Sequence, residues 1–334
     1  MLVYILKRFI LIFPTLIGVS IIVFSIVHLT PGDPAIAMLG EHSSKESLEI
    51  VRKDLGLDKP LYIQYFIFIS NIIKFDFGRS IISKRPVLEE FFERFPATVE
   101  LSLFSMFFAV GLGLIAGILS ATKRYSLFDY SASVFSLGGV SMPVFWLGLV
   151  LIYFFSVKLG ILPVSGRLSY EYYISEYTGF YLIDSIISSD YSAFIDAFKH
   201  LILPSIALGT IPGSIIARIT RSAMLDVLNE EYIKMAASKG CSTYRIVFIH
   251  ALRNALIPVV TIIGLMLGLL LSGAILTETT FSWPGIGKWV VNAVYQRDFP
   301  VIQCATLIIA IIFIVLNLFI DILYAFINPR IRYR

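Results

Sequence analysis

Long runs of apolar residues alternate with short polar connections along this chain. Six runs are long enough to cross a bilayer, because a spanning helix needs about 20 mostly apolar residues. Backbone groups in lipid must be hydrogen-bonded within their own segment, so such runs form helices. The expected spans are approximately 9–29, 97–121, 131–157, 201–222, 254–277 and 301–326. The pattern therefore predicts an all-α membrane protein with six transmembrane helices.

Composition supports this class. Of the 334 residues, 57% are hydrophobic and only 15% are charged, whereas a soluble domain carries roughly 25% charged residues. A soluble monomer of this composition would expose large apolar patches to water, which monomers rarely do. Lys7 and Arg8 precede the first apolar run as in a signal peptide. That run is too long for a signal peptide and no small-residue cleavage site follows it, so we expect an uncleaved first span.

The distribution of charge predicts the orientation, because short loops rich in Lys and Arg stay in the cytoplasm. The loop 159–199 holds five acidic and two basic residues, and we expect it outside. The segment 30–95 is a long periplasmic insertion with two expected amphipathic helices, Ser44–Leu55 and Leu61–Ile73. Both termini should be cytoplasmic, together with the 13 basic residues Lys7, Arg8, Lys123, Arg124, Arg218, Arg221, Lys234, Lys239, Arg245, Arg253, Arg330, Arg332 and Arg334.

Several kinds of site are not indicated by the sequence. The net charge of +4 is concentrated beside helix ends, so we expect membrane lipid and no nucleic acid as a partner. Cys241 and Cys304 fall near opposite faces of the membrane and should not pair. The four histidines share no metal-ligand spacing. The run from Gly285 to Lys288 lacks the full phosphate-loop pattern and lies outside the cell in this topology, so a partner must hydrolyse any ATP.

Small residues and prolines predict how the helices pack. Gly113 and Gly117 repeat at four-residue spacing, as do Gly264, Gly268 and Ser272. Such stripes let helix backbones approach closely, either within this chain or against a partner subunit or translocation path. Four prolines predict kinked or broken helices, namely Pro143, Pro204, Pro212 and Pro258.

The segment 223–253 is too long and too patterned for a simple turn. Residues 225–239 favour a helix with acids early and lysines late, which suits the helix dipole. Gly240 is a good helix terminator, and Ser242 is a suitable cap for a second helix that runs into the fifth span. We therefore expect two short helices joined at Gly240, with an apolar knob on the first formed by Leu228, Tyr232, Met235 and Ala236.

This segment resembles the cytoplasmic signature of ATP-binding-cassette importer permeases, in the form found in dipeptide, oligopeptide and nickel importers. The chain is similar along its length to the first, B-type, permease subunit of that family, and the dipeptide branch is the most similar. The generic importer motif places Glu-Ala-Ala where this chain has Lys234, Met235 and Ala236, so the generic Glu has no equivalent. The matching stretches are Pro31–Pro34, Leu55–Pro60, Ser141–Trp146, Leu162–Gly166, Tyr232–Gly240, His250–Pro258 and Thr277–Gly285.

The resemblance implies a type I importer permease fold in the bacterial inner membrane. It implies a homologous C-type permease subunit, two ATPase subunits of D and F type that bind ATP and Mg²⁺, and a periplasmic or lipid-anchored substrate-binding protein. This chain would bind no cofactor and carry no ATPase site. Met142, Pro143 and Glu278 would line the translocation path or its periplasmic mouth. The segment 223–253 would couple to the ATPases through Glu231, Tyr232, Met235, Ala236, Lys239 and Gly240.

Other functions stay open at this stage. A nickel complex or haem is an alternative cargo to dipeptides and short oligopeptides. A secondary transporter would need no ATPase, but two inverted halves are not evident. A membrane-embedded enzyme would need clustered catalytic residues at membrane depth, and the sequence shows no such cluster.

Overall fold

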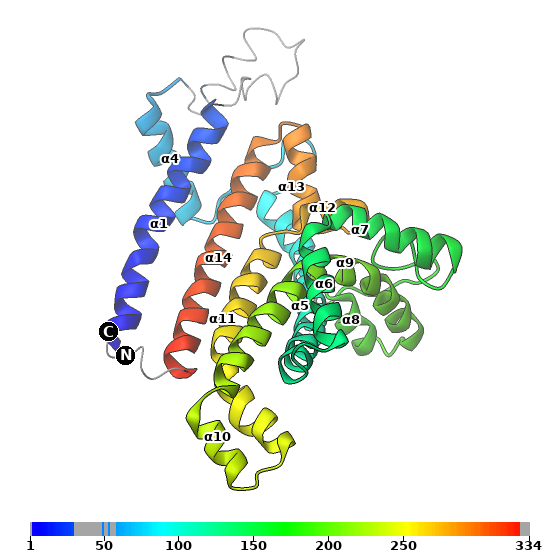
Figure 1. Ribbon diagram of the computed structural model, residues 1–334. Helices are drawn as coiled ribbons and strands as arrows, with labels where there is room; N and C mark the ends of the chain where they lie inside the picture. Colours follow the sequence, from blue (N-terminus) through cyan, green and yellow to red (C-terminus); the bar gives the residue numbers. More distant parts are fainter. Residues whose placement is uncertain (1, 30–48, 50–52, 54–57, 328–334) are drawn as a thin grey trace.

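The computed structural model describes residues 2–29, 49, 53 and 58–327. In these residues the regular secondary structure is helical, apart from one isolated bridge between Arg79 and Pro86. Figure 1 shows the helices as an elongated bundle. Their bounds are α1 Leu2–Leu29, α4 Leu61–Ile73, α5 Val87–Thr122, α6 Leu127–Ser141, α7 Val144–Leu151, η1 Ile152–Lys158, α8 Tyr181–Ile187, α9 Tyr191–Leu228, α10 Glu231–Ser238, η2 Arg245–Ala251, α11 Leu252–Leu271, α12 Ile275–Thr280, α13 Ile286–Tyr295 and α14 Phe299–Ile327.

Four of the described helices are long and apolar enough to cross a membrane: α5, α9, η2 with α11, and α14. They overlap four of the six expected spans. Helices α5 and α9 extend beyond the expected bounds, with 36 and 38 residues, whereas the expected fifth span, 254–277, ends at Leu271 and residues 275–280 form the separate helix α12. Within α1, the residues Phe9–Ser25 form a shorter apolar stretch. The all-helical membrane class is confirmed, whereas the count of six spans stays a prediction.

The expected third span, 131–157, is not one straight helix. It divides into α6 and the pair α7 with η1, which meet at an angle of 108°. The break falls at Met142 and Pro143, where Met142 has extended backbone. Proline has no backbone N–H and forces the preceding residue out of the helical region, which explains the position of the break. The prediction of a kinked or broken helix at Pro143 is confirmed, and the assignment of 131–157 to one span stays a prediction.

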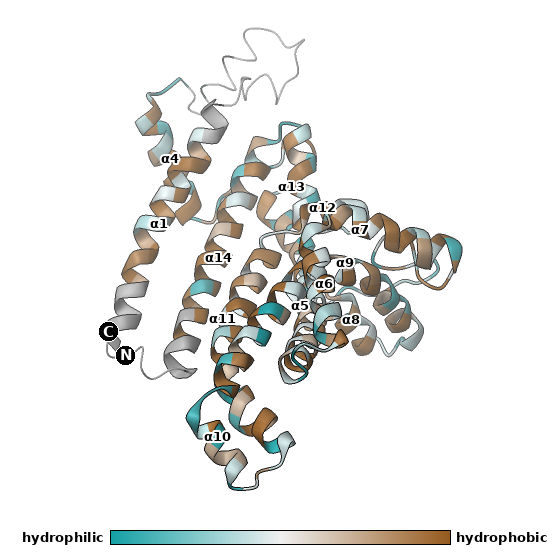
Figure 2. Cartoon of the chain, viewed as in Figure 1, coloured by the Kyte–Doolittle hydropathy of each residue, from teal (hydrophilic) through white to brown (hydrophobic). Residues whose placement is uncertain are grey.

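The two ends of the bundle differ. At one end α10 and its flanking residues project away from the other helices, and α1 begins and α14 ends toward this same side (Figure 1). We call residues 229–251 the α10 hairpin and this end the hairpin end. The opposite end carries α12 and α13. Hydrophobic residues predominate along α1, α11 and α14, whereas the α10 hairpin mixes hydrophobic and hydrophilic positions (Figure 2).

The centre of the bundle is the contact between α5 and α9, the most extensive of any helix pair. Glycines make it close. A Cβ atom on Gly117 would lie 2.6 Å from the Thr220 Cβ and 2.7 Å from the Ala217 carbonyl oxygen, and one on Gly113 would lie 2.8 Å from the Gly213 carbonyl oxygen. These two glycines therefore pack within the chain.

The segment 30–95 is described only from residue 58 onward, apart from residues 49 and 53. The expected helix Ser44–Leu55 lies largely outside the described residues. The expected helix Leu61–Ile73 is present as α4 and packs beside α1. The following stretch returns to the opposite end of the bundle, where the Asp298 carboxylate accepts hydrogen bonds from the Ser80 hydroxyl at 2.5 Å and the Ile81 N–H at 3.1 Å.

The contact between α5 and α9 generates a prediction about stability. Gly117→Ala should destabilise the chain by about 1–3 kcal/mol, because the new methyl group meets a backbone carbonyl that cannot move aside. Gly111→Ala on the same helix is the matched control, since a Cβ there would have nothing within 4 Å. The measurement is the midpoint of thermal aggregation of the purified chain in detergent. Equal midpoints for the two variants would contradict this account of the interface.

Candidate functional site

The α10 hairpin begins where α9 ends, at Leu228. After the first helix, α10, the chain reverses at Gly240, which has a φ of +82°. The Gly240 N–H bonds to the Ala237 carbonyl oxygen at 3.0 Å, and the Cys241 N–H bonds to the Ala236 carbonyl oxygen at 3.2 Å. This pair of bonds is the Schellman arrangement, which requires a left-handed residue at the position of Gly240. The predicted turn at Gly240 is confirmed, whereas the predicted first helix, 225–239, is divided: residues 225–228 end α9 and α10 begins at Glu231.

One side of α10 is fixed to the helices that flank it. Ile233 is buried and packs with Met224 of α9 and with Val247 and Ala251 of η2. The Tyr232 hydroxyl accepts a hydrogen bond from the Asn254 side-chain nitrogen of α11 at 2.7 Å. A displacement of α10 must therefore act on the ends of both α9 and α11. The sequence analysis did not identify Ile233, although its position one residue after Tyr232 placed it on the inner side of the helix.

The outer side of α10 is exposed. Met235 is 57% exposed and Tyr232 is 40% exposed, and Lys239 and Gly240 are exposed at the tip. Glu231 and Lys234 form an exposed ion pair of 2.7 Å. Ala236 is half-buried. The expected apolar knob therefore consists of Tyr232 and Met235, because Leu228 packs into the cluster around Ile233.

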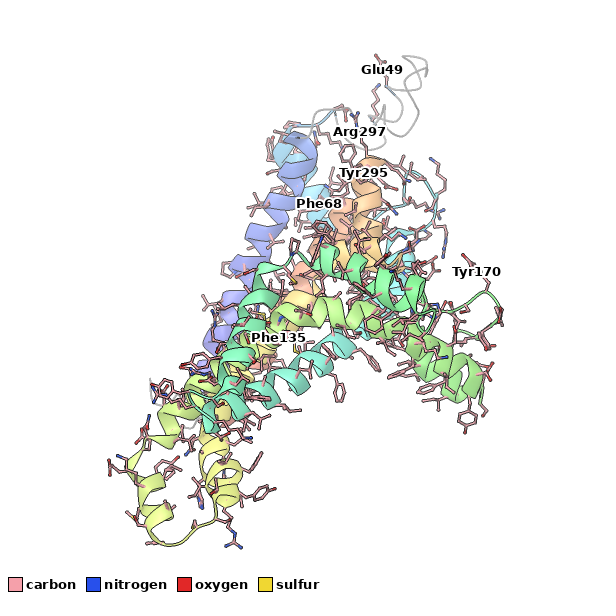
Figure 3. All side chains as sticks on the ribbon, turned by 45° about the vertical axis from the view of Figure 1, so that its right-hand side comes forward. Glu49, Phe68, Phe135, Tyr170, Tyr295 and Arg297 are labelled. Atoms are coloured by element: carbon pink, nitrogen blue, oxygen red, sulfur yellow. The ribbon has the colours of Figure 1, made fainter. Side chains whose placement is uncertain are left out.

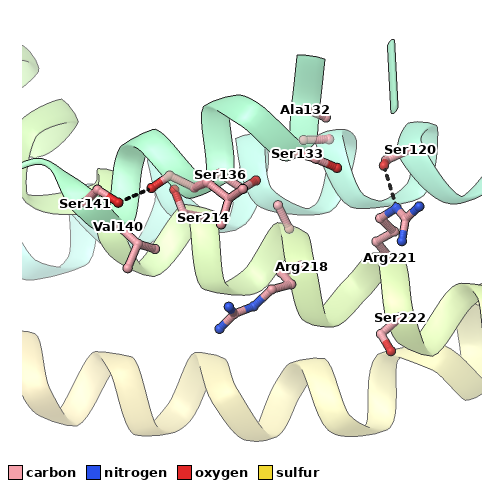
Figure 4. Close-up of a pocket in the computed structure, with 13 residues that line it drawn as sticks. Ser120, Ala132, Ser133, Ser136, Val140, Ser141, Ser214, Arg218, Arg221 and Ser222 are labelled. Carbon is pink, nitrogen blue, oxygen red and sulfur yellow. Dashed lines mark hydrogen bonds between the residues drawn. The ribbon is translucent and has the colours of Figure 1, made fainter. Parts of the chain in front are cut away.

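Between α5, α6 and α9 lies a cavity of about 430 Å³, walled mainly by small and hydroxyl-bearing residues. Its lining includes Ser120, Ser133, Ser136, Ser141, Ser214 and Ser222, together with Arg218 and Arg221 of α9 (Figure 4). A volume of this size is typical of cavities that hold small ligands. The cavity lies toward the hairpin end of α9, and the sequence analysis did not predict it.

The two arginines of this cavity differ in their partners. The Arg221 guanidinium binds both Asp129 carboxylate oxygens, at 2.7 and 2.9 Å, and Asp129 also accepts hydrogen bonds from the Ser120 hydroxyl and the Tyr125 N–H. This network joins the end of α5, the start of α6 and the body of α9. Arg218 is exposed and has no hydrogen-bond or ion-pair partner within the part of the chain that the structure describes. Figure 4 shows Arg221 turned toward Ser120 and Arg218 turned away from it.

Met142 and Pro143, two of the expected path residues, lie at the break between α6 and α7. Met142 is 42% exposed. The neighbouring Ser141 lines the serine-rich cavity, so the break lies at one edge of that cavity. Sequence reasoning placed these two residues inside a span, and the structure places them where the span turns.

Glu278, the third expected path residue, is buried at the opposite end of the bundle with no exposed surface. Its carboxylate accepts hydrogen bonds from the Thr98 hydroxyl of α5 and from the Lys288 N–H of α13, both at 2.9 Å. Gly285 and Gly287 pack against the same carboxylate, which accounts for the glycines of the incomplete phosphate-loop pattern. In this chain Glu278 is an internal link between α5, α12 and α13, and its assignment to the translocation path or the periplasmic mouth stays a prediction.

A second buried carboxylate lies on α5, two residues after Thr98. Glu100 of α5 pairs with Arg167 at 2.5 Å and accepts a hydrogen bond from the Leu182 N–H at 3.1 Å. The Arg167 guanidinium lies over the Tyr181 ring, 3.8 Å from its centroid. Burial raises the pKa of the Tyr181 hydroxyl above its usual value. Glu100 therefore anchors the loop that precedes α8, a role that the sequence did not indicate.

Carboxylates of the acidic loop 159–199 accept hydrogen bonds from other residues of the same loop. Asp184 is fully buried and accepts hydrogen bonds from the Thr178 and Gly179 N–H groups. Asp196 accepts hydrogen bonds from the Ser169 N–H and hydroxyl. The aromatic part of the loop stays exposed, and Tyr170 points away from the bundle in Figure 3. Cys241 and Cys304 are free, and the described residues contain no group of three or more potential metal ligands.

The comparisons with known proteins agree in pointing to transport. Residues 113–333 match the family described as binding-protein-dependent transport system inner membrane component, and residues 1–102 match the N-terminal part of such components. The chain is 52% identical over 336 residues to the di/tripeptide permease protein DppB of Pseudomonas aeruginosa. It is 48% identical over 338 residues to the dipeptide permease protein DppB of Escherichia coli. Both alignments cover 100% of each chain.

A more distant relative and a solved structure extend the comparison. The glutathione permease protein GsiC of Escherichia coli is 42% identical over 334 residues, with 100% of each chain covered. The inward-facing MetNI methionine ABC transporter superposes with a TM-score of 0.55 at 17% identity, covering 73% of this chain and 98% of that chain. The long helices, the projecting α10 hairpin and the full-length sequence matches lead to one assignment. The chain belongs to the binding-protein-dependent transport system inner membrane component family, the permeases of ABC importers.

Proposed function

We propose that this chain is the B-type permease subunit of an ATP-binding-cassette importer that moves dipeptides or short oligopeptides across the bacterial inner membrane. The observation that carries the proposal is the full-length identity of about half to two permeases named for dipeptides and tripeptides. The similarity to a glutathione permease is compatible with this cargo class, since glutathione is itself a small peptide.

The proposed topology has six spans, with both termini and the α10 hairpin in the cytoplasm. The beginning of α1 and the end of α14 lie toward the hairpin end (Figure 1). The basic residues of the α10 hairpin and of the 122–130 connection lie at that end as well, as expected for a cytoplasmic face. The broken pair α6 and α7–η1 would supply the third pass. In this topology α12, α13 and the acidic loop face the periplasm, where a substrate-binding protein would dock.

The α10 hairpin is the proposed coupling element. Its contacting residues would be Glu231, Tyr232, Met235, Ala236, Lys239 and Gly240, docked in a groove of one of two ATPase subunits that bind ATP and Mg²⁺. A C-type permease would bind the second ATPase subunit. The inner side of α10 is fixed to α9 and α11 through Ile233 and Tyr232, so work received by α10 passes to two long helices at once. The helix must make different contacts in the two transport states, because only a differential interaction shifts an equilibrium.

The serine-rich cavity is the proposed contribution of this chain to the translocation path, with Met142 and Pro143 at its edge. Arg218 is the cationic group of that wall without a carboxylate partner among the described residues. An ionisable residue within a spanning helix marks a candidate substrate pathway. Arginine binds carboxylates through two parallel hydrogen bonds, so Arg218 would receive the C-terminal carboxylate of a peptide in transit. The second permease subunit would complete the path.

The coupling proposal predicts a difference between two variants at one position. Gly240→Pro removes the N–H that bonds to Ala237 and cannot adopt a φ of +82°. Gly240→Asn keeps the N–H and tolerates the left-handed region. In the reconstituted transporter, peptide uptake should fall at least about tenfold for Gly240→Pro and stay near wild type for Gly240→Asn. Wild-type uptake in Gly240→Pro would rule out a coupling role for the turn.

A second coupling variant tests the packing of α10 itself. Ala236→Trp adds a large ring at a half-buried position of α10. The ring should disturb the packing of α10 and so uncouple ATP hydrolysis from peptide transport. Ala236→Ser is its conservative control. Copurification of the ATPase subunits and ATP hydrolysis stimulated by the binding protein are measured together with uptake. Hydrolysis that persists without uptake is the expected result, and normal uptake per ATP would argue against the proposal.

The path proposal predicts that Arg218→Gln lowers maximal peptide uptake by about three- to tenfold, the effect of losing one charged hydrogen-bonding interaction. The rate is measured in proteoliposomes at a saturating concentration of binding protein. Arg218→Lys should retain more activity because it keeps the charge. Arg221→Gln should instead reduce the amount of folded protein, because it leaves Asp129 buried without its cation. Unchanged uptake in Arg218→Gln would exclude this residue from the path.

A further inference from the structure

Helix α4 has an unusual composition for a part of an external domain. Its 13 residues, Leu61–Ile73, contain no charged side chain, and none of them is buried within the chain. Charged residues stand immediately outside both ends, Asp58 and Lys59 before the helix and Lys74 and Asp76 after it. At about 20 Å the helix is too short to cross a hydrocarbon core of about 30 Å. A segment of this kind that enters the membrane must leave on the same side.

The contacts of α4 fix its depth along α1. The Tyr65 hydroxyl shares a hydrogen bond of 2.8 Å with the Ser20 hydroxyl, and the Phe24 ring contacts the rings of Tyr65 and Phe68 at centroid distances of 5.4 and 5.7 Å. Ser20 lies near the middle of the apolar run 9–29, and Phe24 lies about 8 Å from its far end at Leu29. Figures 1 and 3 both show α4 beside the part of α1 that ends at Leu29. Helix α4 therefore lies level with apolar residues of α1.

The side of α4 that α1 leaves uncovered is apolar. At 100° per residue, Tyr62, Phe66, Ile69 and Ile73 lie within about 60° of one another on the helix surface. Three of these side chains are largely exposed, with Tyr62 at 65%, Phe66 at 70% and Ile73 at 72%. The polar residues Gln64 and Asn71 lie on the other side of the helix. This division of apolar and polar positions is typical of a helix that rests in a membrane interface.

We propose that α4 is inserted into the lipid of the leaflet toward which α12 and α13 face, with the stripe formed by Tyr62, Phe66, Ile69 and Ile73 against acyl chains. Lipid acyl chains are the occupant that fits this stripe, because the stripe has no polar group except the Tyr62 hydroxyl with which it could bind a polar partner. Tyr62 lies in the first turn, beside Asp58 and Lys59, where an amphipathic ring suits the headgroup level. In the proposed topology this leaflet is the outer, periplasmic one. The insertion of α4 into lipid does not depend on that topology.

Insertion of α4 gives the chain a lipid anchor next to its periplasmic-end structure. The stretch that follows α4 leads within a few residues to Ser80 and Ile81, which hold the Asp298 carboxylate between α13 and α14. Residues 61–73 would then belong to the membrane rather than to a small external domain. The inserted helix would hold the stretch that leads to Ser80 at a constant depth in the bilayer.

The test uses the assembled transporter in liposomes and a nitroxide spin label on a single cysteine. Cys241→Ser and Cys304→Ala supply the background, and Phe66→Cys and Ile73→Cys report from two turns of the stripe. Collision of the label with oxygen, which concentrates in lipid, is compared with collision with the water-soluble Ni(II)–EDDA complex. Lipids labelled at known depths calibrate the scale. Tyr170→Cys is the reference for water exposure, since Tyr170 protrudes from the chain.

Both reporter labels should collide preferentially with oxygen, at a depth within the hydrocarbon region, while the label at Tyr170→Cys collides preferentially with nickel. Preferential collision with nickel at the two α4 positions would show an external helix and overturn the proposal. Protection from both reagents would show that a protein subunit covers the stripe, which also overturns it. Retained peptide uptake by the labelled transporters establishes that the variants are folded. Absence of peptide uptake by the unlabelled wild-type transporter, with the labels still at hydrocarbon depth, would count against the proposed function and leave the lipid assignment standing.

Discussion

The close backbone contact between α5 and α9 is the constraint on which the remaining structure depends. These are the two longest helices, and each carries groups that act at both ends of the bundle. At the hairpin end α5 meets α9 through Gly117, and α9 leads directly into α10. At the opposite end α5 holds Thr98 and Glu100, which bind α12, α13 and the loop before α8. Because the backbones of α5 and α9 touch at these glycines, the two helices form one closely packed unit. This unit joins the α10 hairpin to the opposite end of the bundle.

Buried carboxylates complete the opposite end of this unit. Glu100, Glu278 and Asp298 are each almost fully buried, and each accepts at least two hydrogen bonds, at least one of them from a segment distant in sequence. Burial of a charge is costly unless hydrogen bonds or a counter-charge compensate it, so these groups specify one arrangement of the loops. Hydrogen bonds to these three carboxylates therefore fix the irregular connections at this end of the bundle.

Sequence reasoning identified the helices well and the polar interior poorly, for a physical reason. An apolar run must be helical in lipid, and a glycine at the end of a short helix permits the left-handed turn seen at Gly240, so both features follow from local chemistry. The burial of Glu278 against Thr98 and the pairing of Glu100 with Arg167 join residues that are 180 and 67 positions apart in the chain. Likewise, Pro143 indicated a kink, but the 108° turn depends on how α7 packs against the rest of the fold. The contact of α4 with Ser20 and Phe24 of α1 likewise could not be read from the sequence, because it joins residues about 45 positions apart in the chain.

Helix α6 differs from its neighbours in how little holds it. Its buried residues are Asp129 in the first turn and Gly139 near the last, and the serine-rich cavity and a second, apolar cavity of about 480 Å³ adjoin its length. At one end α6 is held by the ion pair of Asp129 with Arg221, and at the other end it terminates at the break before Pro143. Helix α6 is thus fixed to α9 at its N-terminal end by the ion pair with Arg221, and it turns at its C-terminal end, beside the closely packed pair α5 and α9.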